Sequence, residues 1–253
     1  NTSWTRVKGG EKVGYHVDNA LMNYDPTNPS VIVSDLLLAY QALNKVRDKY
    51  WKDQKQQEIR DLIKACAGLY LEVKADQFSY VPGDSLSLSL EAINRSDIKM
   101  TLASVKLGDY QSFTVRQALR NNRPFNMDMN YVLDNNAEYS DPYWLKEEGS
   151  LGMYKVADTK LRGTPENASA LSWVATIEID GQFIDYELPV IYKENDPVDG
   201  ESYRPLEVTP PVFLNIGEKA YVFGNGGSKR IDVQVLAGKA NLKGELSLQI
   251  PSG

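Results

Sequence analysis

The hydrophobic period of the chain changes at Val81-Pro82-Gly83-Asp84, and this change constrains the fold more than any other feature. Before it, apolar residues recur every three or four positions, which predicts helices. After it, residues 85–90 alternate strictly between serine and leucine, which is the pattern of a half-buried strand. We therefore expect helices at the N-terminal end and β structure in the rest of the chain.

Residues 1–75 are expected to form three helices. The first places Val13 and four further apolar residues up to Tyr24 on one face, and the prolines of residues 25–29 end it. A second helix begins at Pro29 or Ser30, since proline suits the first helical position. A third runs from about residue 54 through residue 73 at helical spacing. Short connections between the helices predict a small antiparallel bundle.

Strand patterns follow the period change at residues 85–90, 100–107, 111–115, 152–156, 171–179 and 183–192. Asp180-Gly181 marks a tight hairpin between the last two. Several short strands separated by turn signals, with no helical pattern between them, predict an antiparallel Ig-like β-sandwich. Residues 121–143 are rich in Asn, Asp and Pro, and we expect them to form a long irregular loop.

Residues 194–201 are acidic, contain Pro197 and Gly200, and are typical of a linker. Strand patterns return at residues 206–214, 219–223, 231–236 and 245–250. Because a sandwich needs about seven strands, this region is expected to hold only the first part of a second one. The fold class is thus multidomain α plus β: a helical bundle over 1–75, a β-sandwich over 76–197, and a linker with a partial Ig-like β-sandwich over 198–253.

Both ends of the sequence resemble cut ends. The chain starts at Asn1 without an initiator methionine or a leader pattern, and it stops just after the alternating residues 246–250. We expect it to be a fragment of a longer polypeptide.

Charge and composition exclude several classes of protein. Residues 76–197 carry 19 acidic and 11 basic side chains, a net charge of −8 that would repel a phosphate backbone, so no nucleic-acid partner is expected. No run approaches the roughly 18 apolar residues of a membrane span. One cysteine excludes a disulfide within the chain, and one histidine excludes a histidine-rich metal centre.

The residues most often used in catalysis have structural explanations here. His16 lies two positions from Asp18, and on a helix such side chains point about 200° apart, so they do not share one ion. Cys66 falls on the apolar face of the third helix without an electropositive partner. Carboxylates are plentiful, so a glycosidase-like pair stays open, although nothing in the sequence selects any two of them.

One stretch has the oxygen spacing that opens a calcium loop, namely Asn126-Met-Asp128-Met-Asn130. The glycine and glutamate that an EF-hand requires are replaced by Tyr131 and Ala137. An EF-hand is therefore rejected, and a looser calcium site stays open as the alternative. We expect no metal ligand, no cofactor and no catalytic residue in this chain.

The best candidate for ligand binding is the aromatic stretch Asp141-Pro-Tyr143-Trp144-Leu. Flat aromatic faces in loops suit sugar rings, which are apolar on their faces and polar at their edges. Asp141, Tyr143 and Trp144 are the predicted binding residues. The alternative is that Trp144 packs into the core as an anchor.

An ordered series of motifs resembles a known family. The series is Ser140-Asp-Pro-Tyr-Trp-Leu145, Gly152-Met-Tyr, Leu161-Arg-Gly-Thr-Pro-Glu166, Pro189-Val-Ile-Tyr-Lys193, Asp196-Pro-Val-Asp-Gly-Glu201, Tyr203-Arg-Pro-Leu206 and Pro210-Pro-Val212. Together with Arg6-Val-Lys-Gly-Gly-Glu11 and Ala65-Cys-Ala-Gly-Leu69, it resembles the non-catalytic C-terminal region of Bacteroidetes-type PIG-L (LmbE-like) deacetylases. The resemblance covers nearly the whole chain.

Members of this family carry a zinc-dependent N-acetyl-sugar deacetylase domain with a Pro-His-Pro-Asp-Asp-like motif and a later histidine. This sequence has neither, and Tyr15-His-Val-Asp-Asn19 lacks the prolines and the adjacent second aspartate, so no catalytic residue carries over. The resemblance implies a periplasmic, secreted or cell-surface location and a parent enzyme that holds zinc. It also implies that this fragment positions or docks its own upstream catalytic domain and is not itself an enzyme.

Two other functions stay open at this point. One is a carbohydrate-binding β-sandwich module that uses Tyr143 and Trp144, with a glycan as partner. The other is a spacer or protein-interaction scaffold, which an exposed apolar patch on the helices would indicate.

Overall fold

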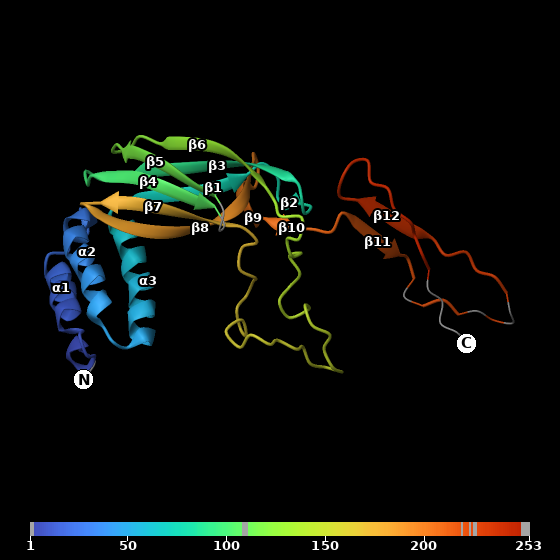
Figure 1. Ribbon diagram of the computed structural model, residues 1–253, viewed down its shortest axis with the longest axis horizontal. Coiled ribbons are helices and arrows are strands. Elements are labelled where there is room, and N and C mark those ends of the chain that lie inside the picture. The colour runs from blue at the N-terminus through green and yellow to red at the C-terminus, as the bar shows by residue number, and fades with distance from the viewer. Residues whose placement is uncertain (1–2, 108–110, 219, 223, 225–226, 249–253) are drawn as a thin grey trace.

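The computed structural model describes residues 3–107, 111–218, 220–222, 224 and 227–248, in which a large curved sheet is accompanied by helices at the N-terminal end (Figure 1). The helices are α1 (Glu11–Met22), α2 (Val33–Ala42) and α3 (Lys49–Cys66), with the 3-10 helices η1 (Trp4–Arg6), η2 (Pro29–Ile32) and η3 (Leu43–Lys45). The strands are β1 (Leu69–Ala75), β2 (Ser79–Tyr80), β3 (Ser85–Asn94), β4 (Met100–Leu107), β5 (Gln111–Leu119), β6 (Phe125–Val132), β7 (Ser172–Ile179), β8 (Gln182–Asp196), β9 (Gly200–Pro205), β10 (Glu207–Val208), β11 (Val212–Ile216) and β12 (Val233–Ala237).

Local capping sets both ends of α3. At its start, the Asp48 carboxylate accepts a hydrogen bond of 3.2 Å from the backbone N–H of Trp51. At its end, Gly68 has φ +62°, a left-handed conformation that glycine adopts without strain and that stops a helix. The expectation that this helix continues to residue 73 is wrong, because the chain turns at Gly68 and enters β1.

Strand β1 shows a period of two. Leu69, Leu71 and Val73 are buried, while Tyr70 and Glu72 between them are partly exposed. Residues 69 and 73 are four positions apart, which fits a helical period as well as a strand period, so this short stretch misleads a pattern-based prediction.

The main sheet has the order β5-β4-β7-β8-β1-β3-β6, with β9 paired to β8 as its eighth strand. Neighbouring strands run antiparallel except β1 and β8, which are parallel from Val73↔Val190 to Ala75↔Tyr192. The sheet is therefore mixed, and its central pair joins parts of the chain more than a hundred residues apart.

The sheet curls into a nearly closed barrel-like form. Strands β5 and β6 stand at opposite ends of the strand order, yet only residues 120–124 connect them. Such a connection spans at most about 20 Å, so the two edges must approach each other. A bridge between Asn94 and Asn121 ties β3 to this connection. The predicted Ig-like β-sandwich is wrong: a sandwich and a barrel share inward alternation along each strand, and the pairing partners distinguish them.

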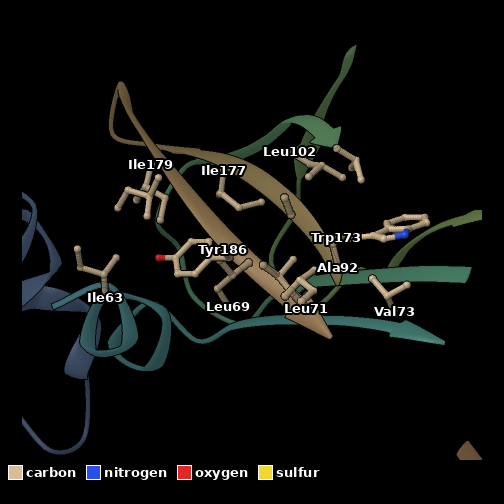
Figure 2. Packing of buried hydrophobic residues seen from close by; sticks show 14 of the residues in the cluster. Ile63, Leu69, Leu71, Val73, Ala92, Leu102, Trp173, Ile177, Ile179 and Tyr186 are labelled. Atoms are coloured by element: carbon tan, nitrogen blue, oxygen red, sulfur yellow. The ribbon is translucent and has the colours of Figure 1, made fainter. Parts of the chain in front are cut away.

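The predicted separate helical bundle is also wrong. One hydrophobic cluster contains buried residues of the helices and of the sheet together. In Figure 2, Ile63 of α3 faces Tyr186 and Leu69 across the junction between the helices and the strands. The helices have only 12, 10 and 18 residues, so they pack against the sheet to bury an adequate apolar area.

A single polar side chain, Asn94, is buried among the described residues. Its Nδ2 donates to the carbonyls of Ile98 (2.8 Å) and Leu119 (3.1 Å). Its Oδ1 accepts from the backbone N–H (2.9 Å) and the hydroxyl (3.1 Å) of Ser96. Asn94 thus joins the end of β3, the β3–β4 turn and the end of β5 at the place where the sheet curls back on itself.

The C-terminal part forms two small sheets. Strand β10 pairs in parallel with β2, and β11 with β12 forms a hairpin at the far end from the helices (Figure 1). The predicted first part of a second sandwich is wrong for the described residues, because both faces of the hairpin are largely exposed instead of covering a core. Of the strands predicted at 219–223 and 245–250, residues 219, 223, 249 and 250 lie outside the described part.

No helix in the described ranges combines the length and the hydropathy that a membrane span needs, in agreement with the sequence prediction. The limits 1–75, 76–197 and 198–253 stay predictions.

Candidate functional site

The long segment between β6 and β7, residues 133–171, contains the predicted binding residues. It projects from the sheet on the same side as the helices (Figure 1). Ser140 fastens it to β10: its backbone N–H donates to the Val208 carbonyl (2.8 Å), and its Oγ accepts from the Val208 N–H (2.9 Å). These bonds fix the start of the segment beside the sheet, so its outer part is presented from a defined position.

Tyr143 is held by hydrogen bonds within this segment. Its backbone N–H donates to Oδ1 of Asn167 (2.9 Å), and its hydroxyl donates to the carbonyl of Thr164 (3.0 Å). Asn167 in turn donates through Nδ2 to the carbonyl of Asp141 (2.7 Å). The two arms of the segment are thus joined across more than twenty residues, and the Tyr143 ring is fixed.

Trp144 packs on Tyr143 with ring centroids 4.9 Å apart and planes at 90°, an edge-to-face contact. Its side chain is partly exposed and lies outside the core cluster. The alternative that Trp144 anchors the core is wrong, since the buried tryptophan is Trp173, which is 0% exposed. Trp144 is therefore placed where a ligand can reach it.

An open groove of about 540 Å³ lies beside Trp144. Part of its lining comes from the tight turn of residues 150–153, in which Ser150 and Met153 exchange backbone hydrogen bonds of 3.1 and 3.2 Å. Gly152 has φ +80° in this turn. The lining residues are Trp144, Leu145, Glu147, Glu148, Gly149, Ser150, Gly152, Met153 and Tyr154.

Gly149 permits the close packing of this turn. A Cβ atom at this position would stand 2.5 Å from the Met153 carbonyl oxygen, a separation that real Cβ atoms do not show. The turn can therefore fold back against the chain only with glycine at this position.

Two ion pairs connect the segment at its surface. Lys146 pairs with Glu138 (2.9 Å), and its hydrogen bond lowers the pKa of that carboxyl below its ordinary value. Lys155 pairs with Glu147 (2.6 Å), and this hydrogen bond raises the pKa of the Lys155 ammonium. Within the described ranges, Glu148 has neither an ion pair nor a side-chain hydrogen bond, so it leaves one uncompensated negative charge in the groove.

The three predicted binding residues play different parts. Trp144 lines the groove, and Tyr143 contacts the Trp144 ring without lining the groove itself. The backbone carbonyl of Asp141 accepts a hydrogen bond from Asn167, and Asp141 does not line the groove. Ligand binding by these residues stays a prediction. The sequence pattern does not single out Glu148 and Tyr154, which line the same groove, although Gly149 and Gly152 mark a turn between them.

The other residues weighed in the sequence are dispersed. His16 on α1 contacts the ring of Tyr15 edge-on at 5.2 Å. Cys66 is partly buried, and this burial raises the pKa of its thiol. Asn126 and Asp128 lie on the exposed face of β6. Over the described ranges, no three residues of the kinds His, Cys, Asp and Glu cluster as a metal site would require.

A second polar cluster lies on the outer face of the sheet, where β8 meets β1 and β9. Lys193 lies 3.4 Å from Glu72 and 2.8 Å from Glu201, and its ammonium is 5.1 Å from the Tyr203 ring centroid. The hydrogen bond with Glu201 raises the pKa of Lys193, and the same bond lowers the pKa of Glu201. Because each contact links neighbouring strands, this cluster has a structural role in holding β9 on the sheet.

Each α-helix also exposes large apolar side chains to solvent. At the end of α1, Leu21 and Met22 are each 75% exposed. Leu38 on α2 and Leu62 on α3 are about half exposed. In contrast, the two exposed positions of strand β3 are Ser85 and Ser87.

No family model matches the chain, and no curated protein matches it. Among solved structures, it is similar to Spo0M, the sporulation control protein of Bacillus subtilis, with 12% identity, coverage of 48% of this chain and 49% of that chain, and a TM-score of 0.23. It is also similar to the alkylpurine DNA glycosylase AlkC of Pseudomonas fluorescens bound to DNA containing an abasic site analog, with 7% identity, coverage of 63% of this chain and 50% of that chain, and a TM-score of 0.23.

A third similar structure is the surface layer protein SbsC, domains 1–6, with 12% identity, coverage of 88% of this chain and 40% of that chain, and a TM-score of 0.19. The chain thus spans half or less of the length of these structures. Similarities of this size carry no argument about fold or function.

Proposed function

We propose that this chain is the non-catalytic accessory region of a larger secreted or periplasmic PIG-L-like de-N-acetylase, where it docks and positions the catalytic domain. The zinc of such an enzyme would be held by that catalytic domain. The ordered motif series from Ser140 to Val212 supports the parentage. The exposed apolar side chains of the helices carry the docking role.

The physical argument for docking rests on the cost of exposed apolar area. Burying a side chain such as Leu21 or Met22 contributes about 1.5–3 kcal/mol, and both are 75% exposed here. Exposed apolar clusters on a soluble protein are typical of interaction sites. We therefore place the contact with the catalytic domain on the helices, with Leu21 and Met22 of α1 at its centre.

The arrangement of the chain suits a positioning role. Residues 133–171 project on the same side of the sheet as the helices (Figure 1). A domain docked on the helices would therefore lie on the same side of the sheet as the groove beside Trp144.

Acetate release tests the non-catalytic part of this proposal. The purified chain, incubated with zinc and N-acetylglucosamine oligomers, is expected to release no acetate above the zinc-only control. Measurable release that depends on the protein would overturn the proposal. The parentage is tested by the coding sequence upstream of Asn1, which should contain a His-x-Asp-Asp motif; an upstream sequence that encodes no such motif contradicts it.

The second candidate function is carbohydrate binding, and the exposure of Trp144 favours it. A fixed, accessible indole beside an open groove is the arrangement that stacking on a sugar ring requires. Glycan-array binding that disappears in Trp144→Ala, with the circular dichroism spectrum unchanged, would support this function. Binding that persists in that variant contradicts a role for this groove.

A further inference from the structure

The charge of the groove beside Trp144 is unbalanced, and this restricts the ligands it can take. Glu147 is neutralised by Lys155 at 2.6 Å, whereas Glu148 has no partner in the described part of the chain. None of the described residues that line the groove is basic. A ligand bound here therefore meets one carboxylate, that of Glu148, which no described cation neutralises.

The aromatic side chains define the second half of the recognition chemistry. Trp144 is fixed by its edge contact with Tyr143, which two hydrogen bonds hold in place. Tyr154, which also lines the groove, is 71% exposed. Because the Trp144 ring is positioned before a ligand arrives, little of its conformational entropy is lost when one binds.

We propose that this groove binds glycans that carry a free, protonated amino group, as in glucosamine oligomers. The sugar ring would stack on Trp144, and the ammonium would pair with Glu148. A carboxylate and an aromatic face are the two groups that attract an ammonium, the first by a charge-assisted hydrogen bond and the second by cation–π attraction. This inference rests on the carbohydrate-binding function proposed above and names its ligand class.

The same chemistry separates this ligand class from related sugars. An N-acetylated sugar keeps the ring that stacks on Trp144 but has no charge for Glu148. A uronic-acid sugar brings a second negative charge beside Glu148, and like charges repel. The groove should therefore rank glucosamine oligomers first, N-acetylglucosamine oligomers second and galacturonic-acid oligomers last.

Calorimetric titration of the full chain at pH 6, where the sugar amine is protonated, tests this ranking. The probes are the tetramers of glucosamine, N-acetylglucosamine and galacturonic acid. We expect the glucosamine tetramer to bind at least tenfold more tightly than the N-acetylated one, with an affinity that falls as salt is raised. Glu148→Gln should bring the two affinities within twofold of each other. The matched control is Glu166→Gln, an exposed glutamate of the same segment that is outside the groove, and it should leave the ratio unchanged.

The outcomes distinguish the two proposals. If the glucosamine and N-acetylglucosamine tetramers bind with equal affinity and Glu148→Gln leaves both affinities unchanged, the proposed ligand class is wrong while carbohydrate binding stands. If none of the three tetramers binds to the folded chain, both are overturned. Because Glu148 is exposed, Glu148→Gln should fold normally, and its circular dichroism spectrum checks this.

Discussion

Replacement of Asn94 by alanine should lower the free energy of unfolding by more than the loss of so small a side chain suggests. The change removes two hydrogen bonds donated to the carbonyls of Ile98 and Leu119, at 2.8 and 3.1 Å. It also removes two accepted from Ser96, at 2.9 and 3.1 Å. A typical hydrogen bond contributes about 1 kcal/mol net, and a buried group left unpaired costs about 1–3 kcal/mol.

These contributions do not add fully. Ser96 is partly exposed and can turn to water, whereas Leu119 is 4% exposed, so its carbonyl loses a partner with little access to solvent. We expect a loss of about 3 kcal/mol in the free energy of unfolding, a large share of the roughly 5–15 kcal/mol of a typical domain. The seam between β3 and β5 should open first.

Urea unfolding followed by tryptophan fluorescence and circular dichroism measures this loss. The matched control is Asn126→Ala, an exposed asparagine on β6, which should change the free energy of unfolding by less than about 0.5 kcal/mol. A loss below about 1 kcal/mol in Asn94→Ala, or one equal to the control, would refute the role of Asn94 in closing the sheet.

Three further predictions concern the groove, the outer cluster and the core. Gly149→Ala should abolish glycan binding and speed amide hydrogen exchange at Met153, because the new Cβ would lie 2.5 Å from the Met153 carbonyl oxygen and would displace the turn. An exchange rate unchanged from wild type contradicts the tight packing of this turn. The hydrogen bond with Lys193 lowers the folded-state pKa of Glu201 below its ordinary 4.5. The stability that this pair adds is therefore present above pH 4.5 and is lost as the pH falls through the folded-state pKa. Lys193→Met should reduce the pH dependence of the free energy of unfolding over that range, and a pH dependence unchanged from wild type refutes the pairing. Trp173 is 0% exposed, so Trp173→Phe should remove the fluorescence component that acrylamide does not quench; if that component persists, the buried placement is wrong.

Part of the fold can be predicted from the sequence because alternation is a local signal. The pattern at residues 100–107 coincides with β4, and the pattern at 85–90 falls within β3. Strand β6 was missed, since Asn126 and Asp128 on its exposed face are poor strand formers, although Met127 and Met129 alternate with them toward the core.

The closure of the sheet could not be predicted in this way. It depends on the parallel pairing of β1 with β8 and on the short β5–β6 connection, which no local pattern records. A strand of a sandwich and a strand of a barrel carry the same inward alternation. Because the alternation is the same in both, the sequence pattern predicts a sandwich where the structure has a barrel-like sheet.

The candidate site shows the same division between local and distant signals. The aromatic pair Tyr143-Trp144 is visible in the sequence as an unusual loop composition. The free charge of Glu148 becomes visible only when Lys155 is seen to pair with Glu147. The ligand class therefore depends on which carboxylate the fold leaves unpaired.

Titration of this chain with the catalytic domain of the proposed parent enzyme tests the docking role most directly. We expect saturable binding, and at least a tenfold rise in Kd (about 1.4 kcal/mol) when Leu21 and Met22 are both replaced by serine. The matched control replaces the exposed polar residues Asn23 and Gln41 by serine, and it should leave Kd unchanged. Absence of binding between the folded partners, or equal Kd values for the apolar and polar double variants, would contradict docking through the helices.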